Sequence, residues 1–241
     1  MKVILLHGFG ETSDVWTSFI PLLPTDHEYI TLDYSVISFC QTIEEYADWV
    51  HSEVLERKIK EFVLIGHSMG GYISLAYAKS YGKFLLGLGL FHSSALADTD
   101  AKKKTRDKTV EFLEKHGTEV FIEDFLPKMY NHSFLKENAE FIRQNLEDNK
   151  QIPSKALQTA TIAMRDREDT RDVLKSLEKP SLMIIGKADK FISFEDALPQ
   201  ISLCQQPYVL LLDHIAHAGM HEAPQACANV IAEFLQACET L

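Results

Sequence analysis

The sequence predicts an α/β protein with a mostly parallel, doubly wound sheet and an inserted helical segment. Six short aliphatic and β-branched runs alternate with helix-like stretches, as in chains built of βαβ units. Residues 96–180 hold 16 basic and 17 acidic residues but only one of the eleven glycines. We therefore expect a core formed by residues 1–95 and 181–241, interrupted by a helical insertion over residues 96–180.

The expected strands are runs that are too continuously apolar to have one wet face. They are Lys2–His7, Glu28–Asp33, Glu61–Gly66, Leu85–Phe91, Ser181–Gly186 and Tyr208–Leu212. The longest apolar stretches, Val3–Leu6 and Tyr208–Leu212, predict buried strands. Both are far shorter than the roughly 18 residues that a membrane-spanning helix needs, so no membrane span is predicted.

Helices are expected between these strands. Thr42 and Glu45 form a capping box ahead of apolar residues at helical spacing, and another helix follows Ser68. Pro224 is expected in the first turn of the last helix, whose buried stripe consists of Val230, Ile231, Phe234 and Leu235. The insertion is expected to be all-helical, because its apolar residues recur at helical intervals between charges.

Composition excludes several classes of protein. With 24 basic and 35 acidic residues the formal charge is −11, which disfavours binding to nucleic acids and to anionic membranes. The apolar run near the first residue is too short for a signal peptide, so a cytoplasmic protein is expected. Four cysteines lack zinc-site spacing and are interpreted as buried, reduced thiols: Cys40, Cys204, Cys227 and Cys238. No cofactor and no metal ion is expected.

The strongest motif is the stretch Gly66-His67-Ser68-Met69-Gly70-Gly71, between a predicted strand and a predicted helix. G-x-S-x-G in this context is typical of a nucleophile on a tight, strained turn, where larger side chains than glycine would collide. Ser68 would stand at a helix N-terminus, which favours the negative charge that develops in acyl transfer. The alternative is an accidental Gly-rich turn.

Together with HGFG, GKADKF and HAGMHEAP, this motif resembles the α/β-hydrolase superfamily, in particular its capped serine hydrolases, over nearly the whole chain. The resemblance implies Ser68, Asp189 and His217 as nucleophile, acid and base, in the chain order of such enzymes. It also implies a helical cap (lid), inserted after the strand that ends near Phe91. Because the family's usual first strands are missing, we expect an α/β-hydrolase fold shortened at the N-terminus.

Three nearby histidines, His214, His217 and His221, compete for the role of base. In related hydrolases the base precedes Glu-x-Pro by a fixed interval, and Glu222-Ala223-Pro224 starts five positions after His217. The resemblance therefore favours His217. A metal site built from the three histidines is the alternative, but no cysteine or carboxylate shares a recognised spacing with them.

Asp189 follows a predicted strand, on the loop at its carboxyl end, where ligand sites of open α/β sheets collect. Its expected task is to orient His217 and to stabilise the imidazolium. His67 and His92 flank the predicted active-site turns and are interpreted as structural, hydrogen-bonded side chains.

Backbone amides are expected to bind the oxyanion of the reaction. Met69 would supply one, and by its match to the family's HG-x-G segment Phe9 would supply the other. The competing interpretation of Gly8-Phe9-Gly10 is a dinucleotide fingerprint, but Ser13 stands where the third glycine is required.

The sequence thus predicts a cofactor-independent serine hydrolase that cleaves carboxylic esters of small to medium acyl substrates through an acyl-enzyme. The same residues could serve a C–C bond hydrolase, a thioesterase or a lyase, or a receptor of this fold that binds a small ligand with little turnover. The cap residues Phe121, Phe125 and Phe134 are expected to set substrate choice. Lys102, Lys103, Lys104 and Arg106 could attract an acidic substrate or simply form a solvated face.

Overall fold

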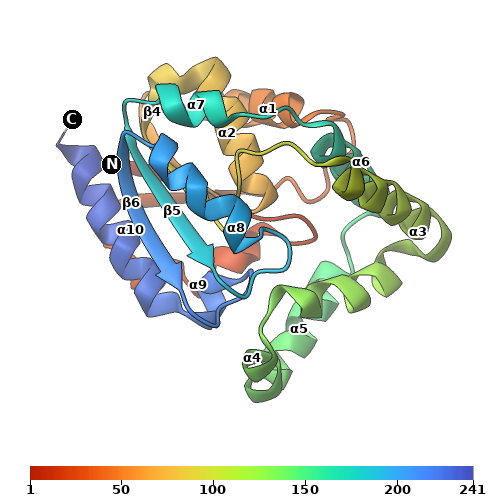
Figure 1. The fold of residues 1–241 in the computed structure, drawn as a ribbon. Helices are drawn as coiled ribbons and strands as arrows, with labels where there is room; N and C mark the ends of the chain where they lie inside the picture. Colours follow the sequence, from red (N-terminus) through yellow and green to blue (C-terminus); the bar gives the residue numbers. More distant parts are fainter. Residues whose placement is uncertain (241) are drawn as a thin grey trace.

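The computed structural model describes residues 1–240 and contains a six-stranded sheet with helices on both faces (Figure 1). The strand order is β2-β1-β3-β4-β5-β6, and every neighbouring pair is parallel. All six predicted strands are confirmed, with ends that move by two residues at most. Their bounds are β1 Lys2–Leu6, β2 Glu28–Leu32, β3 Phe62–His67, β4 Leu85–Phe91, β5 Pro180–Gly186 and β6 Gln206–Leu212.

Burial separates the inner strands from the outer ones. Val3–Leu6 of β1 is fully buried, as predicted, because β1 has a neighbour on each side. The same prediction is wrong for Tyr208–Leu212, where Leu211 is 41% exposed and only Leu212 is buried. β6 is an edge strand, and an apolar run does not reveal whether a second neighbour pairs with it.

The main helices of the core are α1 (Ile43–Glu56), α2 (Met69–Tyr81) and α10 (Pro224–Glu239). The side chain of Thr42 caps α1 by accepting from the Glu45 amide at 3.1 Å, and the predicted stripe of α10 is buried. Helix α10 packs on β4, β5 and β6 along one face, whereas α2 packs on β3 and β4 along the other (Figure 1). None of the described helices combines the length and the hydropathy needed to cross a membrane.

The order of the strands creates a crevice at their carboxyl ends. From β1 the chain turns to β2 on one side, and it then returns to β3 on the other side of β1. The loops after β1 and β3 therefore diverge at this switch point, which is where ligands bind in open α/β sheets. His7–Gly10 and Ser68 lie on these two loops.

The predicted insertion is all-helical, because no described strand lies between Phe91 and Pro180. Its helices are α3 (Asp100–Phe125), α4 (His132–Glu137), α5 (Ala139–Asn149), α6 (Ser154–Asp166) and α7 (Arg171–Ser176). Helix α3 packs against α6 beside the sheet, whereas α7 packs against α2 (Figure 1). Gly117, with φ +77°, introduces a kink into α3, a backbone conformation that glycine adopts without strain.

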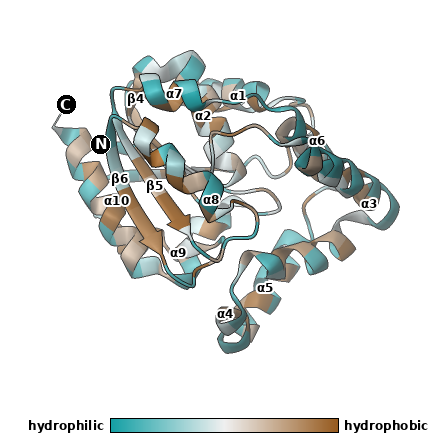
Figure 2. Cartoon of the chain, viewed as in Figure 1, coloured by the Kyte–Doolittle hydropathy of each residue, from teal (hydrophilic) through white to brown (hydrophobic). Residues whose placement is uncertain are grey.

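Hydropathy follows the layers of the fold. Figure 2 shows apolar residues concentrated in β5 and hydrophilic residues over much of α3. The four cysteines are buried and free, which confirms their interpretation as reduced thiols.

Candidate active site

Ser68 stands between β3 and α2 with φ +51° and ψ −113°, a backbone conformation that is unfavourable for a residue with a side chain. Two hydrogen bonds hold it. The Ser68 amide donates to the Phe91 carbonyl at 2.9 Å, and the Ser93 hydroxyl donates to the Ser68 carbonyl at 2.7 Å. The neighbouring strand β4 thus stabilises the turn and leaves the Ser68 side chain partly exposed.

Close approach of strand and helix explains the glycine at position 66. A Cβ atom added to Gly66 would lie 2.1 Å from the Gly70 carbonyl oxygen and 2.4 Å from the Gly71 nitrogen. Both contacts are to backbone, which cannot move aside without opening the turn.

We therefore expect Gly66→Ala to destabilise the protein by about 3 kcal/mol, at the upper end of typical overpacking costs. Thermal unfolding should show a midpoint lower by roughly 6 to 12 °C. Gly82→Ala is the matched control, since within residues 1–240 no atom beyond its chain neighbours lies within 4 Å of its added Cβ, and its φ is −55°. Equal midpoints for the two variants would contradict this steric account.

The three residues implied as nucleophile, acid and base lie in one hydrogen-bonded row. Ser68 Oγ is 2.8 Å from His217 Nε2, and His217 Nδ1 is 2.6 Å from Asp189 Oδ2. They come from the carboxyl ends of β3, β5 and β6, and His217 is only 2% exposed. The other oxygen of Asp189 accepts from the amides of Phe191 and Ile192, which orients the carboxylate.

Asp189 is ionised in this setting. Burial opposes its charge, but the charge of His217 and the hydrogen bond between them lower the pKa of Asp189 well below its usual value. His92 also faces this carboxylate, with Nδ1 at 3.6 Å from Asp189 Oδ2. Because His92 Nε2 accepts from the Gly219 amide, Nδ1 carries the proton, and burial lowers the pKa of His92 to about 4. His92 is thus a neutral side chain whose Nδ1 proton lies near the carboxylate of Asp189.

Glu11 is a residue of this site that the sequence reasoning missed. Its buried carboxylate accepts from the Gly8 amide at 2.9 Å and from His67 Nδ1 at 2.8 Å, while His67 Nε2 donates to the His217 carbonyl at 2.8 Å. Burial disfavours both charges, yet the mutual attraction lowers the pKa of Glu11 and raises that of His67. This buried ion pair ties the loop after β1 to the backbone of His217. The position of Glu11 directly after HGFG was the signal in the sequence from which its role could have been predicted.

The spacing between His217 and Glu222 has a physical cause. Glu222 Oε1 accepts from the Ala216 amide at 3.1 Å and from the Ala218 amide at 3.4 Å, so the carboxylate holds the loop on both sides of His217. Its other oxygen accepts from the Asn131 amide in the insertion.

The competing histidines point elsewhere. His214 is exposed, and His221 contacts the Tyr130 hydroxyl and the Val15 carbonyl. Among residues 1–240, the cluster with metal-ligand geometry consists instead of Asp26, His27 and Glu239, remote in sequence from this loop.

Two backbone amides are available beside Ser68. Met69 is the first residue of α2, so its N–H has no partner within the helix, and Phe9 follows β1 in the adjacent loop. Within residues 1–240 neither amide donates a hydrogen bond. Phe9 is also held by the insertion, because its ring contacts those of Phe121 and Phe125 at 5.8 and 5.4 Å between centroids.

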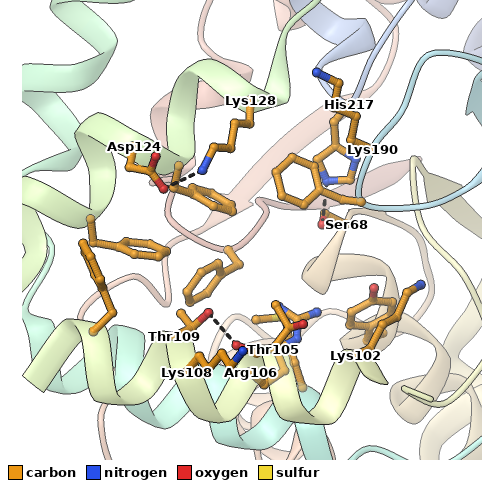
Figure 3. A pocket seen from close by; sticks show the side chains of 17 residues that line it. Ser68, Lys102, Thr105, Arg106, Lys108, Thr109, Asp124, Lys128, Lys190 and His217 are labelled. Atoms are coloured by element: carbon orange, nitrogen blue, oxygen red, sulfur yellow. Dashed lines mark hydrogen bonds and ion pairs between the residues drawn. The ribbon is translucent and has the colours of Figure 1, made fainter. Parts of the chain in front are cut away.

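A cavity of about 440 Å³ opens at Ser68 and His217 (Figure 3). Phe9, Phe121 and Phe125 form part of its wall, as does Phe191, whose ring lies 4.9 Å from that of His217. Phe134 does not line this cavity; it stacks on Tyr130. Of the three aromatic residues expected to face a substrate, the structure thus brings two to the cavity.

Comparison with known proteins shows the family and the fold of this chain. Residues 2–224 match the sequence profile of the family described as alpha/beta hydrolase fold. The chain is 25% identical to Lipase 1 of Psychrobacter immobilis, over 94% of this chain and 74% of the lipase. It is 24% identical to the putative carbamate hydrolase RutD of Rhizobium rhizogenes, over 98% and 92% of the two chains. An esterase structure from Thermogutta terrifontis superimposes with a TM-score of 0.92 at 24% identity, covering 99% of this chain and 90% of the esterase.

Proposed function

Because this chain belongs to the α/β-hydrolase family, we propose that it is a serine hydrolase that cleaves carboxylic esters through an acyl-enzyme intermediate. The observation that carries the proposal is the row Ser68–His217–Asp189, with contacts of 2.8 and 2.6 Å at the mouth of a cavity. The names of the relatives, a lipase and a carbamate hydrolase among them, support hydrolysis of carbonyl compounds in general.

In the first half of the proposed reaction, Ser68 Oγ attacks the ester carbonyl carbon while its proton passes to His217 Nε2. The amides of Phe9 and Met69 donate to the oxyanion of the tetrahedral intermediate. Asp189 keeps the proton of His217 on Nδ1 and stabilises the imidazolium. The intermediate collapses as the alkoxide leaves and takes the proton from His217 Nε2, so that the acyl group remains on Ser68.

In the second half, water attacks the acyl carbon and gives one proton to His217. Collapse of this intermediate returns that proton to Ser68 Oγ and releases the carboxylic acid. The overall reaction is ester plus water giving acid plus alcohol. The proton exchange between Ser68 Oγ and His217 Nε2 joins two atoms that are already 2.8 Å apart.

The experiment that tests the function combines a panel of 4-nitrophenyl esters of increasing acyl length with mass spectrometry of the protein during turnover. Steady release of nitrophenol with an acyl group trapped on Ser68 supports the enzyme. A single stoichiometric labelling without further turnover supports a ligand-binding receptor instead.

We propose further that residues 96–180 form the cap of this hydrolase. Within the segment, α3 contributes one wall of the cavity, and the Met129 carbonyl accepts from the His217 amide at 2.9 Å. Because all five proposed catalytic and oxyanion residues lie outside the segment, the cap would shape the pocket and exclude water without supplying a reacting group.

Cap aromatic residues that touch the cavity should then control acyl-chain selectivity. Phe125→Ala is expected to change the relative kcat/KM of short and long acyl esters by about 10- to 100-fold, as for other altered pocket contacts. Phe134→Ala is the matched control, because it removes an equal side chain that packs on Tyr130 away from the cavity. If both variants keep the parental ranking of esters, Phe125 does not contact the substrate.

A further inference from the structure

The charge of the cavity lining is opposite to that of the chain. The chain has 24 basic and 35 acidic residues. The cavity is lined by five basic residues, Lys102, Arg106, Lys108, Lys128 and Lys190, and by a single acidic one, Asp124. Asp124 is already paired with Lys128, so the lining carries more positive than negative charge. Two of the other cations pair with carboxylates outside the lining: Lys102 lies 3.9 Å from Asp196, and Arg106 lies 3.1 Å from Asp98.

Two of these cations lie across the cavity from the reacting groups. Figure 3 shows Ser68 and His217 on one side and Arg106 and Lys108, from α3, on the other. Lys190 directly follows Asp189 and lines the cavity on the side of the reacting groups (Figure 3). Among residues 1–240, Lys108 and Lys190 form no ion pair. Their charges are thus available to an anion in the cavity.

Arg106 is the cation that the fold positions most firmly. Its Nε donates to Asp98 Oδ2 at 3.1 Å, and the Asp98 side chain is only 1% exposed. Arg167 binds the other oxygen of Asp98 at 2.8 Å and also donates to the carbonyls of Met164 and Leu96. Two arginines on one carboxylate leave an excess positive charge. Both Nη atoms of Arg167 contact these carbonyl and carboxylate oxygens. The two Nη atoms of Arg106, in contrast, make no hydrogen bond within residues 1–240.

A guanidinium that is held through Nε and presents both Nη groups matches the geometry of a carboxylate, which it binds with two parallel hydrogen bonds. The lining of the same cavity also has an apolar, aromatic part that includes Phe9, Phe121 and Phe125. Such a wall accommodates a hydrocarbon segment, with the reacting carbonyl at one end and an anionic group at the other.

We propose that the substrates are esters that carry a carboxylate remote from the scissile bond, such as half-esters of dicarboxylic acids, and that Arg106 binds this carboxylate. Lys108 and Lys190 add positive potential that attracts the anion into the cavity. This inference rests on the proposed esterase function and specifies its substrate class. It also decides between the two interpretations of the basic run at 102–106: Arg106 faces the cavity, while Lys104 lies exposed outside the cavity lining.

The test compares esters of matched length with and without the charge. For the acyl side, 4-nitrophenyl hydrogen glutarate is compared with 4-nitrophenyl pentanoate; for the alcohol side, 4-acetoxybenzoate is compared with its methyl ester. In at least one pair, kcat/KM should be about tenfold or more higher for the anionic ester at low ionic strength, and salt should reduce this advantage. The pair that shows the preference identifies which end of the ester faces Arg106.

Arg106→Gln should reduce the ratio of anionic to neutral kcat/KM by about 10- to 100-fold, the range for a lost charged hydrogen-bond pair. Because both esters are measured on the same variant, a general loss of folded protein cancels in the ratio. Lys104→Gln, on the same helix, removes the same charge outside the cavity and should keep the parental ratio. Lys108→Gln, at an exposed position, should lower the ratio by a smaller factor without disturbing the Asp98 cluster.

Failure of this inference differs from failure of the proposed function. If neutral esters are hydrolysed through Ser68 but anionic esters are not preferred, the carboxylate site is refuted and the esterase function stands. The same holds if Arg106→Gln and Lys104→Gln have equal ratios of anionic to neutral kcat/KM. If no ester is hydrolysed, calorimetry with glutarate on the Ser68→Ala protein tests the site alone. Binding that Arg106→Gln weakens at least tenfold supports it, and absence of binding refutes it.

Discussion

Replacing Ser68 by alanine is expected to lower kcat for ester hydrolysis by about 10⁴- to 10⁶-fold while the fold stays intact. In the proposed mechanism the hydroxyl is the group that attacks the substrate, and its Oγ is already 2.8 Å from Nε2 of His217, the proposed base. The small, partly exposed Ser68 side chain contributes little to packing, and the turn is held by backbone atoms and the Ser93 hydroxyl. The variant should therefore unfold at the same temperature as the parent protein.

The measurement is kcat on 4-nitrophenyl esters, with circular dichroism for the thermal midpoint. Ser202→Ala is the control, since it removes the hydroxyl of an exposed serine that donates a hydrogen bond to the Pro199 carbonyl at 2.8 Å. Residual turnover of more than about one hundredth would be incompatible with the acyl-enzyme mechanism, because background catalysis without the nucleophile is far weaker.

Asp189→Asn is the second change with a large expected effect, a loss of about 10⁴-fold in kcat. The carboxylate accepts the Nδ1 proton of His217 at 2.6 Å, whereas the amide nitrogen of asparagine donates and favours the wrong tautomer. The negative charge that stabilises the imidazolium is lost as well. His92, which is neutral because its pKa is about 4, cannot replace that charge.

Asp213→Asn provides the same chemical change four residues before His217, at an exposed position paired with Lys187. It should leave kcat within about twofold of the parent, as expected for a surface ion pair. If Asp189→Asn behaved like this control, another group would have to orient His217, and the assignment of the acid would be wrong.

Much of the fold was predictable because its signals are local. Strands such as Leu85–Phe91 are contiguous apolar runs, and the capping of α1 by Thr42 depends on residues three positions apart. The turn at Ser68 is similarly local, since the steric conflict at Gly66 arises with Gly70 and Gly71. Segments of this kind carry their physical cause within a few residues. Asp189 and His217 were predicted from their order in the chain and from the likeness to a family. An aspartate in a loop would not by itself have allowed this prediction.

The parts that were missed depend on contacts between distant segments. The Glu11–His67 pair joins residues 56 positions apart, and its charge state follows from burial, which no motif shows. Helical spacing predicted that the apolar residues of the insertion lie on helices, but it could not separate Phe125, at the cavity, from Phe134, against Tyr130. Which neighbour covers a helix face is decided when the helices pack.

The sequence by itself thus determined the strands and the strained turn at Ser68. It also determined which nucleophilic, acidic and basic side chains follow the carboxyl ends of the strands. Each of these features follows from the sterics and polarity of neighbouring residues. The tertiary structure alone decided which side chains meet there. It set β6 at the edge of the sheet, turned Arg106 rather than Lys104 toward the cavity, and buried Glu11 against His67. The physical reason is that burial, electrostatic pairing and cavity shape depend on distances between segments that are far apart in the chain.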